Sequence, residues 1–321
     1  MERKYLLIGG AGFIGSHCLE RLIANDTNIL TIYDNFKSGR MWHVKQFETH
    51  PHVTIIRGDA KDFDHLNKTM NSHDVVFHFA ANADISKAVS EPSVDFWEGT
   101  FLTHNILEAM RINGIRRIVY TSGSGVYGDT GYESVVEDNL TMLPISPYGA
   151  SKLASEALIS AYTHMFGMQA LIFRFANVVG PHQTHGVAYD FIRRLMKNPK
   201  ILTILGDGSQ TKSYIYISDI IDAMIGLEDK ESNSLKVFNV ATEDCITVTE
   251  IAQMVVQSLG LKNVLFKYTG GKRGWRGDIP VVYINSQKIR GENWHNRYTS
   301  KQAMQKAIDS LIEDFQNGNL M

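Results

Sequence analysis

Two hydrophobic patterns alternate along the first part of the chain. Short apolar runs rich in β-branched residues lie at 4–8, 28–33, 53–57 and 74–79, and each is expected to form a buried strand. Residues 13–24 instead repeat apolar side chains at helical spacing. Strands separated by helical segments are typical of a parallel sheet covered by helices on both faces. The pattern therefore predicts an α/β protein.

The rest of the chain continues this alternation. Further helices are expected at 93–113, 146–166, 187–197, 247–259 and 300–315, and further strands at 170–175 and 236–240. We predict a Rossmann-type doubly wound parallel sheet with a smaller C-terminal α/β domain. The first domain comprises residues 1–176 and the returning segment 213–243. The smaller domain comprises 177–212 and 244–321.

A glycine-rich loop, Gly9-Gly10-Ala11-Gly12-Phe13-Ile14-Gly15, lies between the first strand and the first helix. In a dinucleotide-binding loop, the first glycine permits a tight turn, the second lets the backbone approach a pyrophosphate, and the third allows close helix packing. Asp34 ends the second strand, where a carboxylate accepts hydrogen bonds from the adenosine ribose and repels a 2′-phosphate. The loop and Asp34 together predict NAD as the cofactor, in preference to NADP.

Ligands of doubly wound sheets bind outside the carboxyl ends of the strands. The predicted NAD-binding residues follow from this rule and from the motifs, and they are Gly9, Gly12, Phe13, Ile14, Gly15, Asp34, Asn35, Lys37, Ser38, Gly39, Asp59, Ala60, Phe79, Ala80, Ala81, Ser122, Tyr148 and Lys152.

Tyr148 and Lys152 are four residues apart, so they fall on one face of the predicted helix. An ammonium beside a phenol favours the ionised phenol, which can then act as a general base. A tyrosine titrates near 10, so Lys152 and the positive charge of oxidised nicotinamide are expected to lower its pKa. Such a pair also occurs by chance on helix surfaces, but the upstream glycine loop favours the catalytic interpretation.

Several motifs appear in a characteristic order: the glycine loop, Thr121-Ser-Gly-Ser-Gly-Val-Tyr-Gly128, Tyr148-x-x-x-Lys152, Arg174-Phe-Ala-Asn-Val-Val-Gly-Pro181, the segment 206–219 and Arg273-Gly-Trp-Arg-Gly-Asp278. In this order the chain resembles the extended short-chain dehydrogenase/reductase family, and in particular its nucleotide-sugar epimerases and dehydratases, typified by UDP-glucose 4-epimerase. The resemblance covers nearly the whole chain.

The resemblance implies roles for individual residues. Tyr148 is the expected base, and Lys152 holds the nicotinamide ribose and the charge state of Tyr148. The expected substrate-binding residues are Ser124, Asn177, Val187, Lys212, Arg273, Arg276 and Asp278. Lys212 and at least one of the two arginines would bind the diphosphate, with Asp278 on the nucleotide ribose.

One departure from the family pattern concerns the catalytic hydroxyl. Its usual position corresponds to Gly123, which is flanked by Ser122 and Ser124. Glycine permits a local backbone adjustment, so either serine could supply the hydroxyl, and we favour Ser124. A second departure is Gly99, where relatives often have asparagine.

Ser124 and Gly125 also stand where dehydratases carry an acidic pair and near where uronate decarboxylases carry a glutamate. The remaining chemistry is oxidation and reduction at C4. A nucleotide-sugar 4-epimerase is the first hypothesis, and a hexose or heptose nucleotide 4-dehydrogenase that releases the 4-keto product is the second. A non-catalytic NAD-sensing protein is a third, disfavoured because Tyr148 and Lys152 are both kept.

Composition adds few constraints. The 321 residues are 44% hydrophobic, enough for a large core, and a net charge of −2 predicts neither a nucleic-acid nor a membrane partner. The two cysteines, Cys18 and Cys245, indicate a reducing, cytoplasmic environment. His182 and His185 lack a neighbouring carboxylate or cysteine, so we expect no metal site. In relatives, the helices at 93–113 and 146–166 form a dimer interface, so a homodimer is expected.

Overall fold

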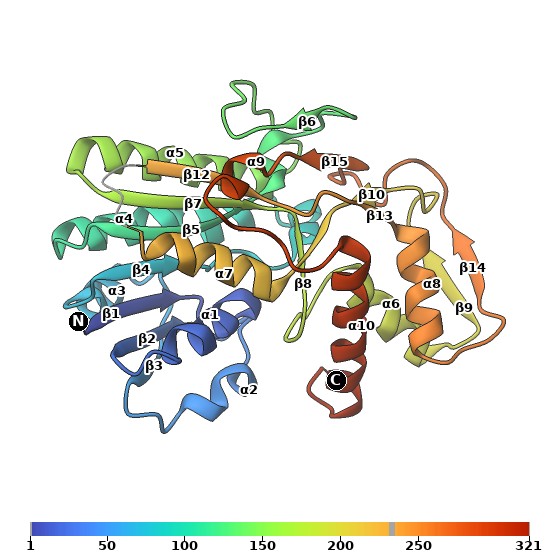
Figure 1. The fold of residues 1–321 in the computed structure, drawn as a ribbon, viewed down its shortest axis with the longest axis horizontal. Coiled ribbons are helices and arrows are strands. Elements are labelled where there is room, and N and C mark those ends of the chain that lie inside the picture. Colours follow the sequence, from blue (N-terminus) through green and yellow to red (C-terminus); the bar gives the residue numbers. More distant parts are fainter. Residues whose placement is uncertain (1, 231–234, 321) are drawn as a thin grey trace. The chain divides into compact units, whose positions relative to one another are not determined.

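The structure is a computed structural model that describes residues 2–230 and 235–320 (Figure 1). The chain divides into two compact units, each built from several segments. The first unit consists of Met1–Val126, Pro144–Arg174 and Ile221–Phe238. The second consists of Tyr127–Leu143, Phe175–Ile220 and Asn239–Met321.

The first unit is organised around a seven-stranded sheet with the order β12-β7-β5-β4-β1-β2-β3. Its strands are β1 (Arg3–Ile8), β2 (Asn28–Asp34), β3 (Val53–Arg57), β4 (Val75–His78), β5 (Arg117–Gly123), β7 (Gln169–Phe175) and β12 (Leu235–Val240). Tyr5 of β1 pairs in parallel with Leu30 on one side and Val75 on the other. The strand order reverses direction between β1 and β4, which is the position where doubly wound sheets bind ligands.

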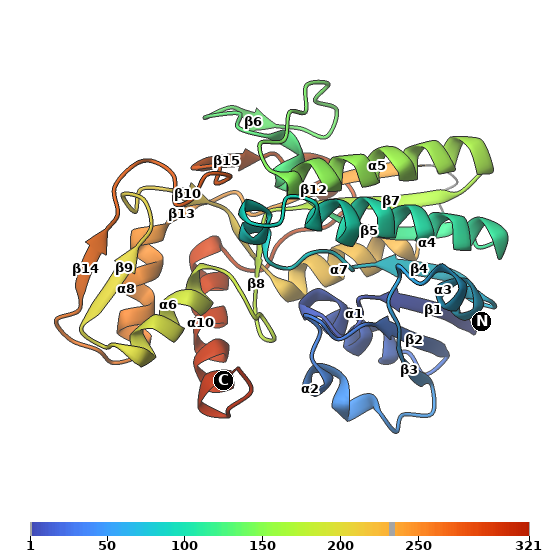
Figure 2. The same ribbon diagram turned by 180° about the vertical axis from the view of Figure 1, so that it is seen from behind.

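Helices cover both faces of this sheet. They are α1 (Phe13–Ile23), α2 (Met41–Val44), α3 (Phe63–Met70), α4 (Phe101–Ile112), α5 (Pro147–Phe166) and α7 (Ile217–Glu228). Leu6 and Ile8 of β1 share a core with α3, α4 and α5. Figures 1 and 2 show α1 and α7 on the opposite face. The predicted doubly wound sheet is therefore confirmed.

The helix predicted at 93–113 differs from its expected form. It begins as a π-helix, η3 (Phe96–Thr100), and continues as α4. The hydroxyl of Ser151 lies in this wide turn, where it accepts a hydrogen bond from the Thr100 nitrogen at 3.0 Å. A Cβ at Gly99 would lie only 2.2 Å from the same Oγ. Glycine at this position thus makes room for the Ser151 hydroxyl.

The second unit contains three small sheets. They are a four-stranded sheet of β13 (Ile246–Thr247), β10 (Thr211–Lys212), β15 (Val281–Ile284) and β6 (Ser134–Val135), and the pairs β8 (Asn177–Val179) with β11 (Tyr214–Tyr216) and β9 (Ile201–Ile204) with β14 (Leu265–Tyr268). The helices α6 (Val187–Lys197), α8 (Val248–Ser258) and α10 (Ser300–Gln316) share one apolar core, and α9 (Gln287–Arg290) is a single turn.

Packing assigns residues 127–143 to the second unit, whereas the predicted boundary places them in the first domain. The reason is that Ser134 of β6 pairs with Tyr283 of β15. The assignment of NAD and nucleotide sugar to separate domains stays a prediction. No helix within residues 2–230 or 235–320 is long and apolar enough to cross a membrane.

Candidate active site

Close packing explains two glycines of the loop between β1 and α1. Gly9 has a φ of 81°, and a Cβ there would lie 2.6 Å from the Ala80 nitrogen. A Cβ at Gly15 would lie 2.5 Å from the carbonyl oxygen of Gly9. A Cβ at Gly12 would instead meet only that same oxygen, at 3.2 Å, among the described atoms within 4 Å. Gly12 is the N-cap of α1, so the space beside it is available to an anion at the helix N-terminus.

Asp34 lies directly beside this loop. Its Oδ2 accepts a hydrogen bond from the Ala11 nitrogen at 3.0 Å, and its Oδ1 accepts one from Phe36 at 2.8 Å. Burial raises the pKa of Asp34, although both backbone donors oppose that effect. A Cβ at Gly39 would lie 2.8 Å from Oδ1, so glycine keeps the space beside the carboxylate open. Each oxygen retains a lone pair for a ribose hydroxyl.

A charged cluster follows β2 and β3. The Asn35 amide donates to Asp59 at 3.3 Å, and the Lys37 ammonium lies 3.5 Å from Asp59. Sequence reasoning missed two members of the cluster, Lys61 and Glu98, which form an ion pair with each other. Glu98 also lies 3.5 Å from Lys37. The cationic charge of Lys37 is therefore largely balanced by two carboxylates.

The remaining predicted NAD residues lie around the ends of β3 and β4 and at the start of α1. The nitrogens of Phe79 and Ala80 both donate to the carbonyl oxygen of Ile8, at 2.9 and 3.0 Å, which holds this turn against β1. Ala81 follows them and is half-buried. Of the others, Phe13 and Ile14 open α1, Ala60 accepts a hydrogen bond from Asn105 at 3.0 Å, and Ser38 is exposed.

Tyr148 and Lys152 lie in the first two turns of α5. The Ser146 hydroxyl caps this helix by accepting the Gly149 nitrogen at 3.1 Å, and Pro147 occupies its first turn. The Lys152 Nζ lies 5.7 Å from the centre of the Tyr148 ring and donates to the Thr121 carbonyl oxygen at 2.7 Å. The predicted placement of both side chains on one helix face is confirmed.

The expected lowering of the Tyr148 pKa by Lys152 and bound nicotinamide together stays a prediction, and in the chain by itself burial dominates the pKa of both side chains. Burial, followed by the negative charge of Asp95, raises the pKa of Tyr148 to about 12. Burial lowers the pKa of Lys152 to about 8, against the opposing effects of Glu156 and Asp95. Desolvation is therefore the largest cause of both shifts, and it acts in opposite directions on the phenol and the ammonium.

The two serines beside Gly123 have different surroundings. Ser122 is buried, and its hydroxyl donates to Glu156 at 2.5 Å. Glu156 also forms a buried ion pair with Arg174 at 2.6 Å. Ser124 begins the short helix η4 (Ser124–Tyr127), is half-buried, and has no hydrogen-bond partner within the described ranges. Of the two hydroxyls, that of Ser124 is the one available to a ligand.

The loop that carries Ser124 packs closely against the start of α5. A Cβ at Gly149 would lie 2.5 Å from the carbonyl oxygen of Gly125. Gly125 and Gly149 are the residues that follow Ser124 and Tyr148. Close approach of these two backbones therefore places Ser124 and Tyr148 on neighbouring segments.

The second unit brings together most of the predicted substrate residues. Lys212 Nζ donates to Asp278 Oδ1 at 2.6 Å, and the Gly274 nitrogen donates to Oδ2 at 2.9 Å. Arg273 donates to the Asp278 carbonyl oxygen at 2.7 Å and pairs with Asp129, a residue that sequence reasoning missed. This network leaves two Lys212 hydrogens for a phosphate and free lone pairs on Asp278 for hydroxyl groups.

The other three substrate candidates lie in different environments of this unit. The Asn177 side-chain amide donates a hydrogen bond to the Ser213 carbonyl oxygen at 3.3 Å. Ser213 directly follows Lys212, so Asn177 and Lys212 lie close together. Arg276 is exposed and has no ion pair or hydrogen bond to any residue that the structure describes. Val187 begins α6 and packs against the apolar core of the unit.

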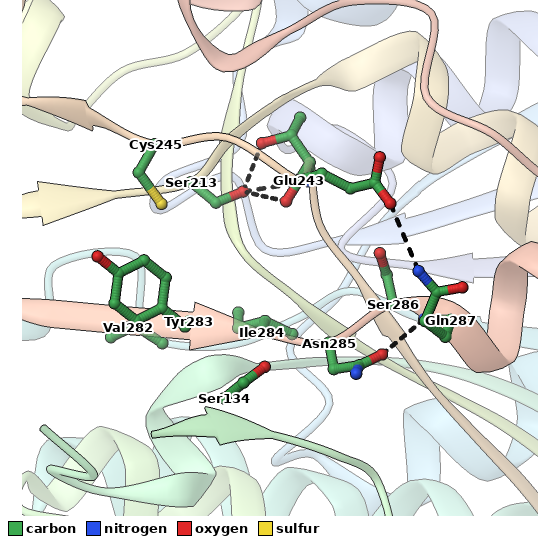
Figure 3. A pocket seen from close by; sticks show the side chains of 11 residues that line it. Ser134, Ser213, Glu243, Cys245, Val282, Tyr283, Ile284, Asn285, Ser286 and Gln287 are labelled. Carbon is green, nitrogen blue, oxygen red and sulfur yellow. Dashed lines mark hydrogen bonds between the residues drawn. The ribbon is translucent and has the colours of Figure 1, made fainter. Parts of the chain in front are cut away.

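A shallow pocket of the second unit does not include these candidates. Figure 3 shows its lining, formed mainly by Ser213 and Cys245 on one side and by residues of β15 and α9 on the other. The Ser213 hydroxyl is already bonded to Thr242 at 2.7 Å, and burial raises the pKa of Cys245. We therefore assign no chemistry to this pocket. Among the described residues, no group of three or more His, Cys, Asp or Glu side chains is arranged to hold a metal ion.

Comparison with known proteins identifies the family. Residues 5–241 match the family model described as "NAD dependent epimerase/dehydratase family". The chain belongs to the NAD dependent epimerase/dehydratase family. It is 30% identical over 263 residues to UDP-glucose 4-epimerase of Mycolicibacterium smegmatis, which covers 80% of this chain and 83% of that relative. It is 33% identical over 267 residues to UDP-N-acetyl-alpha-D-glucosaminuronate decarboxylase of Bacillus cytotoxicus, again 80% of each chain.

A solved structure of UDP-galactose 4-epimerase has the same fold as this family member. Its TM-score is 0.85 at 34% sequence identity, with 97% of this chain and 99% of that chain aligned. The resemblance based on motifs and the prediction of an NAD-dependent enzyme are confirmed. The geometry of Gly12, Gly39 and Asp34 is compatible with NAD, since each leaves room or hydrogen-bonding capacity where the cofactor needs it.

Some residues of this site could not be expected from motif spacing. Glu156 is the exception, because its spacing of four residues from Lys152 on the same helix predicts that the two side chains are neighbours. Asp95 and Lys61 gave no such indication, since they reach the site through tertiary packing of separate segments. The roles of the individual candidate residues stay predictions.

Proposed function

We propose that this protein is an NAD-dependent nucleotide-sugar 4-epimerase that acts through a transient 4-keto sugar. The observation that carries the proposal is the arrangement of Tyr148, Lys152 and Ser124 in the unit that also contains the NAD loop. The names of relatives with the same fold, UDP-glucose 4-epimerase and UDP-galactose 4-epimerase, support this reaction and favour a UDP-sugar as substrate.

In the proposed reaction, Tyr148 accepts the proton of the sugar O4 and later returns it. NAD, held by the glycine loop and Asp34, would supply reversible hydride acceptance at C4, so that no net oxidation occurs over a turnover. Lys152 favours the tyrosinate through its positive charge and positions the nicotinamide ribose. The Ser124 hydroxyl donates to the reacting oxygen, where charge develops in the transition state.

We assign binding of the nucleotide diphosphate to the second unit. Lys212 and one of the two arginines, Arg273 or Arg276, provide positive charge for the phosphate oxygens. Asp278 accepts hydrogen bonds from the ribose hydroxyls of the nucleotide. Asn177 forms hydrogen bonds with the sugar nucleotide through its side-chain amide. Support comes from the network in which Lys212 and Arg273 each donate a hydrogen bond to Asp278, and from the bond of Asn177 to Ser213, the residue after Lys212.

Two neighbouring reactions of the family are disfavoured. Dehydration at C6 and decarboxylation of a uronate need acidic side chains near the sugar, whereas this chain has Ser124 and Gly125 at those positions. The likeness to a decarboxylase therefore reflects shared fold and cofactor. The second candidate activity is a 4-dehydrogenase, favoured by Gly123 in place of the usual hydroxyl residue. That activity requires an external oxidant and would accumulate NADH.

The test of the proposal is Tyr148→Phe, which removes the proton acceptor but keeps the ring. Interconversion of C4 epimers, followed by NMR with UDP-glucose, should fall at least ~100-fold, the lower range for general base catalysis. The matched control is Tyr132→Phe, because Tyr132 is 81% exposed and lies in the second unit. Near-normal interconversion by a folded Tyr148→Phe protein would overturn the assignment of the base.

We also propose a homodimer formed through α4 and α5. These helices pack against each other and expose several large apolar side chains, including Ile112 (53%), Met165 (75%) and Phe166 (46%). These three side chains lie in the last turns of the two helices, where a partner subunit would cover them. Sedimentation of a monomer at micromolar concentration would contradict this proposal.

A further inference from the structure

Asp95 is a buried carboxylate to which the reaction described above gives no role. It is 2% exposed and immediately precedes the π-helix η3. Its Oδ1 accepts a hydrogen bond from the Asn82 amide at 2.9 Å. Its Oδ2 is also buried and has no hydrogen-bond partner among the described residues. An ionised carboxylate with an unpaired, buried oxygen is costly, so a nearby positive charge is expected.

The backbone of Asp95 is attached to the helix that carries the proposed catalytic pair. The Ser151 hydroxyl donates to the Asp95 carbonyl oxygen at 2.6 Å. Ser151 lies between Tyr148 and Lys152 and directly precedes the lysine. Through Asn82, the same aspartate is joined to the segment that follows Phe79, Ala80 and Ala81. Asp95 thus connects α5 with the turn predicted to line NAD.

The other titratable groups near Lys152 are either paired with a cation or neutral. Glu156 accepts hydrogen bonds from Ser122 and forms a bidentate ion pair with Arg174, both through buried contacts. Burial, assisted by the Lys152 charge, lowers the pKa of His78 to about 3, so this imidazole is neutral. Burial raises the pKa of Tyr120, whose ring centre lies 4.9 Å from Lys152 Nζ.

Electrostatic effects connect Asp95 with the catalytic pair in both directions. The charge of Asp95 raises the pKa of Lys152 and that of Tyr148, and the charge of Lys152 lowers the pKa of Asp95. Burial raises the pKa of Asp95 overall, the Asn82 hydrogen bond opposes this effect, and the exposed Asp84 adds to it. Among the described residues, Asp95 is therefore the carboxylate near Lys152 that no cation neutralises by direct contact.

We propose that Asp95 is the counter-ion of Lys152, a positioning residue that keeps the lysine protonated inside the buried site. The inference rests on the proposed function only because that function gives Lys152 a role in the active site. Asp95 acts through Lys152 and Tyr148 and does not contact the reacting atoms. Without its negative charge, the ammonium of Lys152 would have only the charge of Glu156, which is already paired with Arg174, to oppose its desolvation cost.

The direction of the effect follows from the sign of the charge. Removal of a nearby anion disfavours the ammonium of Lys152 and favours the phenolate of Tyr148, so both groups should titrate at lower pH. The reaction needs a charged lysine and an ionised tyrosine. Both limbs of its pH–rate profile should consequently move to lower pH, whereas a purely structural defect would lower the rate without moving them.

The test uses Asp95→Asn, which removes the charge and keeps an acceptor for Asn82. The ¹³Cε resonance of Lys152, assigned by its absence from Lys152→Met, is titrated by NMR in protein labelled at the lysine ε-carbon. Its midpoint should shift to lower pH in Asp95→Asn. Glu91→Gln is the matched control, because it removes an exposed charge of the same segment that pairs with Lys87. An unshifted midpoint in folded Asp95→Asn overturns the proposal.

A second measurement covers the case in which Asp95→Asn does not fold. In Lys152→Met, the ¹³Cγ resonance of Asp95 should titrate at higher pH than in the unmutated protein, since its cation is gone. An unchanged Asp95 titration contradicts the proposal. Neither NMR titration depends on turnover, so a shifted midpoint in a protein without epimerase activity would refute the proposed function and leave the counter-ion intact.

Discussion

Ser122 and Ser124 flank the same glycine, but their hydroxyls have different hydrogen-bonding environments. The Ser122 hydroxyl is bonded to the buried Glu156 at 2.5 Å, whereas that of Ser124 has no partner in the described part of the chain. A hydroxyl bound to a buried carboxylate is part of the folded framework, since its loss leaves that carboxylate less well satisfied. A half-buried, unbonded hydroxyl can instead meet a ligand.

Substitution of each serine by alanine should separate the roles of the two hydroxyls. Ser124→Ala should slow the oxidation half-reaction by about 100-fold, the effect of a lost donor to a developing oxyanion, and leave stability unchanged. Ser122→Ala should cost about 1–3 kcal/mol of unfolding free energy, because Glu156 loses a hydrogen bond. Stopped-flow absorbance of NADH and urea denaturation measure the two effects. The reverse ranking of rates would assign the catalytic hydroxyl to Ser122.

At this scale, the sequence was sufficient where geometry depends on short spacing. Lys152 lies over Tyr148 because four residues make one helical turn, and Asp34 lies by the loop because it ends the neighbouring strand. The pKa of Tyr148 could not be predicted, because it depends on burial and on Asp95, a residue 53 positions away whose approach requires the whole fold.

The turn between β1 and α1 shows how one element combines packing and binding. A Cβ at Gly15 would overlap the Gly9 carbonyl oxygen, at 2.5 Å, whereas a Cβ at Gly12 would meet only that oxygen, at 3.2 Å. Both have backbone conformations outside the positive-φ region recorded for Gly9. The effect of an alanine at either position therefore comes from the contacts of its methyl group and not from backbone strain.

Gly15→Ala and Gly12→Ala form a matched pair. Gly15→Ala should destabilise the protein by about 1–3 kcal/mol, because its Cβ would overlap the Gly9 carbonyl oxygen. Gly12→Ala should leave the unfolding free energy nearly unchanged but weaken NAD binding, since its Cβ occupies the space beside the helix N-terminus. Urea denaturation and calorimetry distinguish them. Equal NAD affinity in Gly12→Ala and the unmutated protein would refute the phosphate-binding role of this loop.

Most long, strongly patterned elements were predicted, but the helix α7 and the strand β5 were not, and neither were most short elements. The helix α5 begins and ends where its cap and periodicity indicate. The π-helix η3 was missed because it depends on the Ser151 hydroxyl, which comes from another helix. The strands β9 and β14 were also missed, because each has only four residues and is defined by its pairing with the other, which is distant in sequence.

For the molecule as a whole, buried histidines couple folding to pH. Burial lowers the pKa of His43 to about 4 and that of His78 to about 3, below the value near 6.5 of an unfolded chain. The unfolded state thus binds more protons at mildly acidic pH. Stability contributed by these neutral imidazoles is present above pH 6.5 and is lost as pH falls toward the folded-state values.

The unfolding free energy should fall between pH 7 and pH 5.5 by about 1 kcal/mol for each of the two histidines. Urea denaturation at both pH values measures the change. His43→Gln should make the decrease in unfolding free energy between the two pH values smaller by the contribution of one histidine. His164→Gln, on the exposed surface of α5, should leave that decrease unchanged. A pH dependence that is the same in His43→Gln and the unmutated protein would contradict this account.

The doubly wound class of the first unit's sheet could be predicted, although not its strand order, because a repeated strand and helix pattern allows few parallel arrangements. The small sheets of the second unit could not, since β6 pairs with β15 across about 150 residues of sequence. For the same reason, the network of Lys212, Arg273 and Asp278 was expected only from family resemblance.

The most direct test of the central claim is the fate of the hydrogen on C4. The enzyme is incubated with UDP-glucose deuterated at C4, and both epimers are analysed by NMR while absorbance follows NADH. The account predicts UDP-galactose that retains deuterium at C4, with no NADH accumulating, because the same hydrogen leaves and returns within one turnover. Loss of deuterium to solvent, or accumulation of NADH with a 4-keto product, would contradict it.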